Sequence, residues 1–206
     1  MNTQTSNQAS CRGLLAQAEA IINTGRVFES ARTSQKALLH YNVALAMLKV
    51  LADYDHENDH ENHRLLQQLT RVHDRLGRVY LVGLNTTQAA LHLEAAVVGY
   101  DRLFGSGNRG SFEMSVLLAE ACVRGGHAVA GQAAAKAAAT VLEQVQGYCS
   151  PSAAYAYYWL YRSELILGNQ EAAVAAASKM GAYLVANLDA HNGGAASLLL
   201  REVQLS

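Results

Sequence analysis

Two stretches decide the fold: Leu76-Gly77-Arg78-Val79-Tyr80 and, twelve residues past the glycine, AALHLEAA from Ala89 to Ala96. The same punctuation occurs earlier as Gly25-x-x-Phe28, followed at the same offset by Ala37-x-x-x-Tyr41-x-x-Ala44. A small residue opposite an aromatic one, followed by a stripe of alanine, a large residue and alanine, lets two antiparallel helices approach closely and interlock. The sequence therefore predicts closely packed pairs of antiparallel helices.

Two later segments carry a weaker form of the same pattern. The segment 112–145 has its small and large residues at Leu118, Ala119, Cys122, Gly131, Ala135 and Ala138. The segment 154–187 matches at Tyr157, Leu160, Ala173 and Ala177. It departs at Tyr161, where a small residue belongs, and at Glu164, where an aromatic residue belongs. Four copies of one helical hairpin are therefore expected.

The aligned hairpins resemble the tetratricopeptide repeat (TPR) family, whose pattern places Leu-Gly-x-x-Tyr and Ala-x-x-x-aromatic-x-x-Ala on two successive helices. The resemblance implies an all-α fold, a right-handed superhelix of about four antiparallel helix hairpins. We expect one domain over 1–206, with repeats at about 18–51, 70–103, 112–145 and 154–187. A short capping helix is expected at 195–203, after Gly193-Gly194.

The chain departs from the common TPR pattern in its spacing. Gly77, Ala119 and Tyr161 follow one another at steps of 42 residues, whereas a TPR repeat has about 34. No proline closes any of the second helices, and longer helices explain both departures. Some TPR families, such as the kinesin light chains, use this longer step. The step from Gly25 to Gly77 is 52 residues, which predicts an insertion at 53–63.

Composition excludes several classes of protein. Of 206 residues, 50% are apolar, 16% are charged and one is proline, a balance that favours helix. The formal net charge of −1 argues against a nucleic-acid partner. No apolar run reaches the roughly 20 residues that span a bilayer, and the polar start is not a secretory signal. Three unpaired cysteines fit a reducing compartment. We therefore expect a cytoplasmic protein, and its alanine-rich, lysine-poor composition suggests a bacterial one.

The predicted insertion contains the sharpest local motif. His56-Glu57-Asn58-Asp59-His60 satisfies H-E-x-x-H, in which two histidines on one helix face bind zinc and the glutamate polarises water. His63 could complete a set of three histidine ligands. The tract has no apolar face, however, so a solvated loop or helix extension is favoured. We predict no cofactor and no enzymatic activity, and keep a zinc-dependent hydrolase as the alternative.

The resemblance also implies a binding groove. In TPR proteins, positions two, five and nine of the first helix of each repeat commonly face the concave surface. Carried over, they give candidate partner-binding residues, namely Arg26, Arg71, Arg78, Tyr155, Tyr158 and Arg162. Because the guanidinium fork matches a carboxylate, these residues suit an acidic or C-terminal peptide segment. The alternative is that these arginines are exposed surface charges with no shared partner.

The favoured function is a protein–protein interaction module that binds another polypeptide as a chaperone, adaptor or regulatory subunit. The sequence names no partner. Tyr155, Tyr157, Tyr158, Trp159 and Tyr161 cover every face of one expected helix, and aromatic residues anchor interfaces. These rings pack between hairpins or hold a homodimer together. A self-associating structural subunit is therefore a further alternative.

Overall fold

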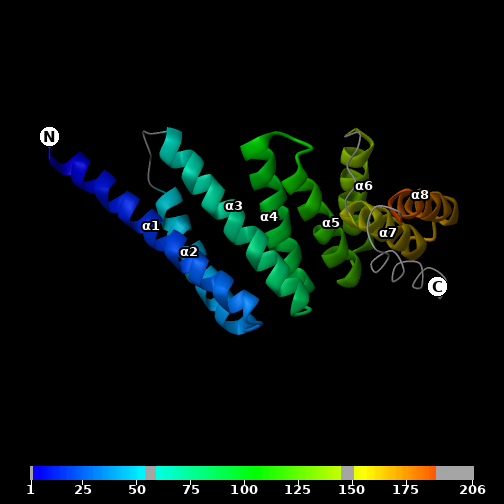
Figure 1. The fold of residues 1–206 in the computed structure, drawn as a ribbon, viewed down its shortest axis with the longest axis horizontal. Helices are drawn as coiled ribbons and strands as arrows, with labels where there is room; N and C mark the ends of the chain where they lie inside the picture. Colours follow the sequence, from blue (N-terminus) through cyan, green and yellow to red (C-terminus); the bar gives the residue numbers. More distant parts are fainter. Residues whose placement is uncertain (1, 54–58, 145–150, 189–206) are drawn as a thin grey trace. The chain divides into compact units, whose positions relative to one another are not determined.

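The chain folds into helical hairpins, seen in a computed structural model that describes residues 2–53, 59–144 and 151–188 (Figure 1). Within these ranges there are eight helices and no strand. The helices are α1 (Asn2–Ser30), α2 (Ser34–Ala52), α3 (Asp59–Val82), α4 (Thr86–Phe104), α5 (Arg109–Arg124), α6 (Ala128–Gln144), α7 (Pro151–Ile166) and α8 (Gln170–Leu188). Consecutive helices pair as α1–α2, α3–α4, α5–α6 and α7–α8. The prediction of an all-α, repeat-type fold is confirmed.

The hairpins fall into two compact units. The first unit, Met1–Ser106, holds α1 to α4, and the second, Gly107–Ser206, holds α5 to α8. In the first unit α3 packs against α2, and in the second α7 packs against α6 and α5. Each unit is thus two hairpins stacked through successive helices, the arrangement that buries the apolar face that a single hairpin leaves open.

Each predicted repeat overlaps one hairpin. Segments 18–51, 70–103, 112–145 and 154–187 overlap α1–α2, α3–α4, α5–α6 and α7–α8, and residue 145 lies outside the described residues. The division into repeats stays a prediction. Of the predicted insertion 53–63, Asp53 follows the end of α2 and residues 59–63 form the start of α3. Residues 54–58 and the predicted cap 195–203 lie outside the described residues. The acidic first turn of α3, with Asp59 and Glu61, suits the positive end of a helix.

Helix boundaries follow local side-chain chemistry. The Asn85 side chain accepts a hydrogen bond from the Gln88 backbone N–H (3.2 Å), and Asn108 accepts one from Ser111 (3.0 Å), so that α4 and α5 begin on an asparagine cap. Gly126 and Gly168, at φ of 82° and 78°, end the turns after α5 and α7 in the left-handed region that favours glycine. The connections are short, and each hairpin is therefore locally encoded.

In the first unit, glycines set how closely the paired helices approach, and two of them lie on the first helix of a hairpin. A β-carbon built on Gly25 would lie 2.7 Å from Tyr41 Cε1, and one built on Gly77 would lie 2.6 Å from Leu93 Cγ. Both large side chains are fully buried. The glycine of the first helix is therefore the hole that the large residue of the second helix fills, as the sequence pattern predicts.

The second unit uses the same device from the other helix. A β-carbon on Gly131 of α6 would lie 2.5 Å from Val123 Cγ2 and 3.2 Å from the Val123 backbone nitrogen of α5. The α7 rings Tyr157, Tyr158 and Trp159 join a core built with α5, α6 and α8. The third copy thus keeps a glycine at its helix contact, on the second helix instead of the first, whereas the fourth copy packs through its aromatic rings.

Glu164 explains one departure from the repeat pattern. It is 2% exposed, and its Oε2 accepts hydrogen bonds from Gln132 Nε2 and Asn169 Nδ2, both at 2.7 Å. Lys136 Nζ lies 3.2 Å from Glu164 Oε1. Burial raises the pKa of Glu164, but hydrogen bonds from Asn169, Gln132 and Lys136 outweigh burial and hold the pKa below its usual value. A polar clamp between α6, α7 and the α7–α8 turn therefore replaces the aromatic residue.

We expect Gly77→Ala to lower the free energy of unfolding by about 1–3 kcal/mol, since the added methyl group overpacks against Leu93. Urea denaturation followed by circular dichroism measures the change. Gly13→Ala on α1 is the control: a β-carbon there meets no atom within 4 Å, so that variant should gain up to about 1 kcal/mol of helix propensity. A similar effect of both substitutions would contradict the packing argument.

Candidate functional site

The candidate site is one face of α3 in the first unit, together with the adjoining end of α1. Arg64, Arg71, Arg75 and Arg78 recur along α3 at steps of seven, four and three residues, the spacing that keeps side chains on one side of a helix. Arg64 Nη2 lies 2.9 Å from Glu19 Oε1 of α1. We call this set, with Arg26 of α1, the arginine face.

An open hollow of about 520 Å³ lies on the arginine face between α1 and α3. It is lined by Asn23, Arg26, Val27, Glu29, Ser30 and Arg75. Five of these residues come from the C-terminal end of α1, and Arg75 comes from α3. The hollow therefore exists only because two first helices of neighbouring hairpins lie side by side.

Glu29 links this hollow to the core. The Tyr41 hydroxyl donates a hydrogen bond of 2.6 Å to Glu29 Oε2, and Arg75 Nη1 lies 3.4 Å from Glu29 Oε1. Burial of Tyr41 and its hydrogen bond to Glu29 both raise the pKa of the phenol. Tyr41 therefore stays a neutral donor that orients Glu29, while the contact between Glu29 and Arg75 is long and weak.

Two polar atoms of α3 stay unsatisfied. Arg75 Nε and Gln68 Oε1 are buried and have no hydrogen-bond partner among the described residues. They lie seven residues apart, about 10.5 Å along the helix, one a donor and the other an acceptor. A buried polar atom without a partner costs about 1–3 kcal/mol, so both side chains carry an energetic cost in this conformation.

The predicted partner-binding residues of the first unit differ in their exposure and in their contacts. Arg26 lines the hollow and is exposed, as is Arg71. Arg78 instead forms an ion pair with Asp74, whose Oδ2 also accepts a hydrogen bond from the Tyr100 hydroxyl at 3.1 Å. Burial and Asp74 raise the pKa of Tyr100 to about 12. Through Asp74, Arg78 therefore contributes to the packing of α3 on α4.

The sequence analysis missed Arg75 and Gln68, which bear the unsatisfied atoms. Arg75 falls outside the positions carried over from the TPR family. The spacing of Arg71, Arg75 and Arg78 on one helix side would have found it. No sequence signal marks Gln68, because its burial depends on neighbouring helices.

In the second unit the predicted residues lie together on α7, but one is not available to a partner. Tyr158 is 4% exposed and belongs to the core, which corrects its assignment to a binding surface. Arg162 Nη1 donates a 3.0 Å hydrogen bond to the Tyr158 hydroxyl, and its guanidinium lies 5.9 Å from that ring's centre. Tyr155 is half-buried against the same core. Helix packing thus uses most of this aromatic helix.

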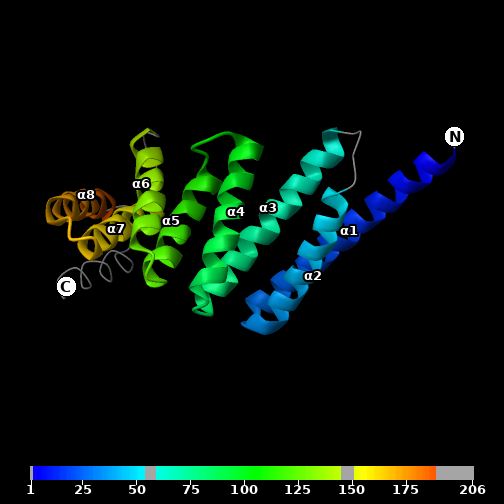
Figure 2. The ribbon, with the colours of Figure 1, turned by 180° about the vertical axis from the view of Figure 1, so that it is seen from behind.

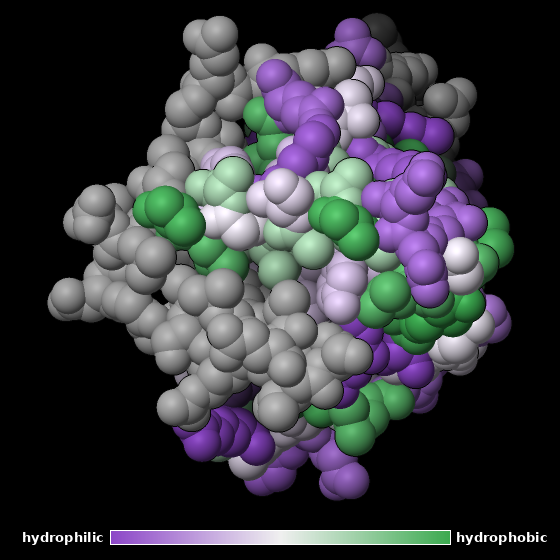
Figure 3. All heavy atoms as spheres, turned by 90° about the vertical axis from the view of Figure 1, so that its right-hand side faces the viewer, coloured by the Kyte–Doolittle hydropathy of each residue, from purple (hydrophilic) through white to green (hydrophobic). Residues whose placement is uncertain are grey.

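The exposed apolar side chains of the second unit are aliphatic rather than aromatic. Leu165 and Ile166 of α7 and Val174 and Val185 of α8 are examples. Figure 3 views the side on which α7 and α8 lie in Figure 1 and shows hydrophobic residues interspersed with hydrophilic ones. Self-association through the aromatic rings stays a prediction.

The histidine tract is only partly described. His56 lies outside the described residues, and His60 and His63 belong to the first turns of α3. His63 Nε2 lies 3.1 Å from Gln67 Nε2. Over residues 2–53, 59–144 and 151–188, no three His, Cys, Asp or Glu side chains are arranged to hold a metal ion. The zinc hypothesis therefore finds no completed ligand set in this part of the chain.

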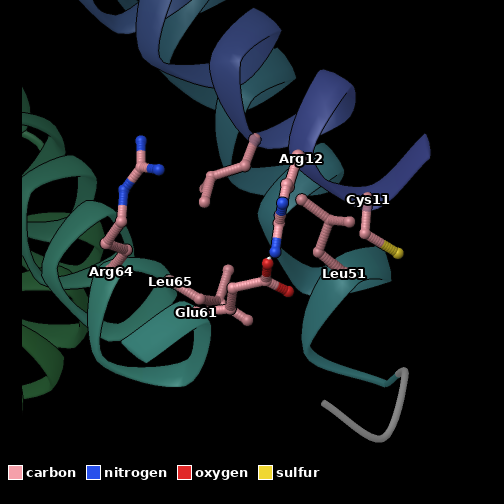
Figure 4. Close-up of a pocket in the computed structure, with 7 residues that line it drawn as sticks. Cys11, Arg12, Leu51, Glu61, Arg64 and Leu65 are labelled. Carbon is pink, nitrogen blue, oxygen red and sulfur yellow. Dashed lines mark hydrogen bonds and ion pairs between the residues drawn. The ribbon is translucent and has the colours of Figure 1, made fainter. Parts of the chain in front are cut away.

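A small pocket beside this tract closes between α1, α2 and α3 (Figure 4). Its lining is Cys11, Arg12, Leu15, Leu51, Glu61, Arg64 and Leu65, and its volume is about 20 Å³. Arg12 Nε points to Glu61 Oε1 in an ion pair across the pocket. A space of this size holds a single water molecule, so it is no substrate pocket.

Behind the arginine face, two histidines meet between α3 and α4. His73 Nδ1 and His92 Nδ1 lie 3.0 Å apart, and the His92 ring stacks on Tyr80 at 5.5 Å. Burial, then His92, then Lys49 lower the pKa of His73 to about 4. Burial and Lys49 also lower the pKa of His92. Both rings are therefore neutral near pH 7, and one donates to the other.

Comparison with known proteins finds similar solved structures, including two of one protein. No family model matches the chain, and no curated protein matches it. One solved structure is a protein described as a kinesin light chain of Podosopora anserina with nearly identical TPR-like repeats. It is 13% identical, covers 86% of this chain and 98% of its own, and has a TM-score of 0.47. The Q17M structure of that protein is also 13% identical, covers 85% and 97%, and has a TM-score of 0.46.

None of the helices in the described ranges combines the length and the apolar run that crossing a bilayer requires.

We expect the histidine pair to make stability depend on pH. Unfolded histidines take up protons near pH 6.5, whereas folded His73 does so only near pH 4. Between these values the unfolded chain binds more protons, so the free energy of unfolding should fall as pH drops from about 6.5 to about 4. Denaturation at several pH values measures this slope.

The double variant His73→Gln/His92→Gln should show a shallower slope over the same pH range than the wild type. His127→Gln, at an exposed position outside the pair, is the control and should keep the wild-type slope. If the double variant keeps the wild-type slope too, the histidine pair does not contribute to the pH dependence of stability.

Proposed function

We propose that this protein is a non-enzymatic interaction module that binds an acidic polypeptide segment on the arginine face of its first unit. Its role would be that of a chaperone, an adaptor or a regulatory subunit in the cytoplasm. The observation that carries the proposal is the open hollow of about 520 Å³, which the exposed Arg26 lines together with Arg75. A carboxylate is the strongest acceptor for the guanidinium of Arg26.

Charge supports an acidic partner. The arginine face gathers five arginines, Arg26, Arg64, Arg71, Arg75 and Arg78. Three carboxylates lie among them, Glu19, Glu29 and Asp74, each in an ion pair with one arginine. Five positive and three negative charges leave an excess of two, and neither exposed Arg26 nor Arg71 forms an ion pair within the described residues. Such a face attracts acidic chains and repels basic ones.

Shape and hydrogen bonding support a polypeptide over a compact small molecule. The hollow is open, and the exposed Arg71 and half-buried Gln68 extend the face along α3 beyond it. An extended peptide can present acidic side chains to the exposed Arg26 and Arg71 at the same time, which a compact small molecule cannot do. A carboxylate side chain at the Arg75 end would then sit between Arg75 and Arg26.

The test is capture of partners from a lysate of the source organism by immobilised protein, with quantitative mass spectrometry. We expect the double variant Arg26→Glu/Arg71→Glu to capture at least about tenfold less of the specifically bound polypeptides than the wild type, since it reverses two unpaired charges. Arg78→Glu is less informative, because it places a second carboxylate against the half-buried Asp74 and should also weaken the fold.

Arg102→Glu is the control, because it reverses one charge on the exposed surface of α4, in the same unit but outside the arginine face. It should keep the captured set. From a library of randomly displayed peptides, the wild type and Arg102→Glu should both enrich sequences rich in Asp and Glu, whereas Arg26→Glu/Arg71→Glu should not. Equal capture by the Arg26→Glu/Arg71→Glu variant, with its helicity unchanged, would refute the arginine face as the binding surface.

A further inference from the structure

The outward side of α2 carries an apolar stripe. Leu39, Val43 and Val50 are 63%, 44% and 54% exposed, and Ala46 between them is exposed as well. The opposite side of α2 buries its core residues against α1 and α3. Figure 2 shows the first unit from behind, and there no other described helix of that unit lies over α2.

A helix that is apolar on two opposite sides is normally covered on both. Single exposed aliphatic residues are ordinary, but four in one line on one helix form a continuous patch. The outward side of α2 is therefore missing a cover within the first unit.

Spacing and charge indicate what that cover is. The stripe continues at both ends into exposed charged residues, so that Lys36, Leu39, Val43, Ala46, Val50 and Asp53 follow at steps of three, four, three, four and three. This is the heptad spacing of a two-stranded coiled coil. Lys36 at one end is a cation and Asp53 at the other is an anion. Two copies of the stripe that run in opposite directions therefore place opposite charges against each other at both ends.

We propose that α2 pairs antiparallel with α2 of a second copy of this chain, forming a two-fold symmetric dimer. Across the interface, Leu39 then packs against Val50 of the second copy, and Val43 packs against Ala46 of the second copy. Each end closes with Lys36 against Asp53 of the second copy. Every pair occurs twice, as a two-fold interface requires. The Lys36 ammonium lies 5.5 Å from the centre of the Phe28 ring, a weak contact that leaves its donors open.

The corresponding helix of the second hairpin lacks this complementarity. At the same 52-residue offset that relates Gly25 to Gly77, the stripe on α4 reads Leu91, Ala95, Val98 and Arg102. Its ends are Gln88 and Gly105 instead of a lysine and an aspartate. Of these two helices, α2 alone has an ion at each end of its stripe, so the antiparallel pairing favours α2 over α4.

The interface is small. One pair of helices of this length buries less than the roughly 800 Å² per partner of a standard interface, so the dimer should dissociate in the micromolar range. The arginine face belongs to α1 and α3 and takes no part in the pairing, so this inference does not rest on the proposed function. The two copies would present two such faces, which favours a partner with repeated acidic segments.

Sedimentation equilibrium of the full chain over roughly 1 to 300 µM tests the proposal. We expect a monomer–dimer equilibrium for the wild type. Leu39→Glu should weaken dimerisation roughly 100-fold or more, because it buries two carboxylates in the stripe. Leu91→Glu makes the same change at the equivalent exposed position of α4 and should leave the dimer intact. A monomer throughout that range, or a dimer that Leu39→Glu leaves unchanged, would overturn the proposal.

Charge reversal tests the orientation. Lys36→Glu alone and Asp53→Lys alone each place like charges at both ends, and each should weaken the dimer roughly tenfold. When the two variants are mixed, a heterodimer restores opposite charges at both ends, and affinity should return to the wild-type value. If the mixture associates no better than the separate variants, the antiparallel register is wrong. Circular dichroism of each variant confirms that the fold is kept.

Discussion

Everything in the first unit depends on the close approach of paired helices at Gly25 and Gly77. Each glycine leaves a hole that one large side chain of the next helix fills, Tyr41 in one hairpin and Leu93 in the other. Because neither hole admits a β-carbon, the two helices of a hairpin keep one rotation about their axes. That rotation decides which residues of α1 and α3 face the core and which face outward.

The same contact connects packing to the candidate site. Tyr41 fills the hole at Gly25 with its ring, and its hydroxyl reaches past the core to Glu29 at the edge of the hollow. Glu29 in turn holds Arg75 by a long contact that leaves the Arg75 Nε unsatisfied. A structural residue of the repeat thus places the charge that the arginine face presents.

The repeat also leaves surfaces with different chemistry on opposite sides of the first unit. The first helices, α1 and α3, carry arginines and paired carboxylates, whereas the second helix, α2, turns aliphatic residues outward. Ionic contacts made by the former depend on salt, while apolar contacts made by the latter do not. Binding of a partner and self-association are therefore physically separable in this chain.

The sequence by itself determined the hairpins, because the spacing of glycine, aromatic and alanine residues lies within one helix pair and fixes its contact locally. It also predicted Arg26 and Arg71 as partner-binding residues; both are exposed, and their role in binding stays a prediction. It did not show that Tyr158 is buried, that Asp74 accepts a hydrogen bond from Tyr100 of α4, or that Arg75 and Gln68 bear the unsatisfied atoms. Those features depend on partners in other helices, such as Glu29, which lies 46 residues before Arg75. Only the tertiary structure decided them, because ion pairing and burial depend on distances in space that no local pattern contains.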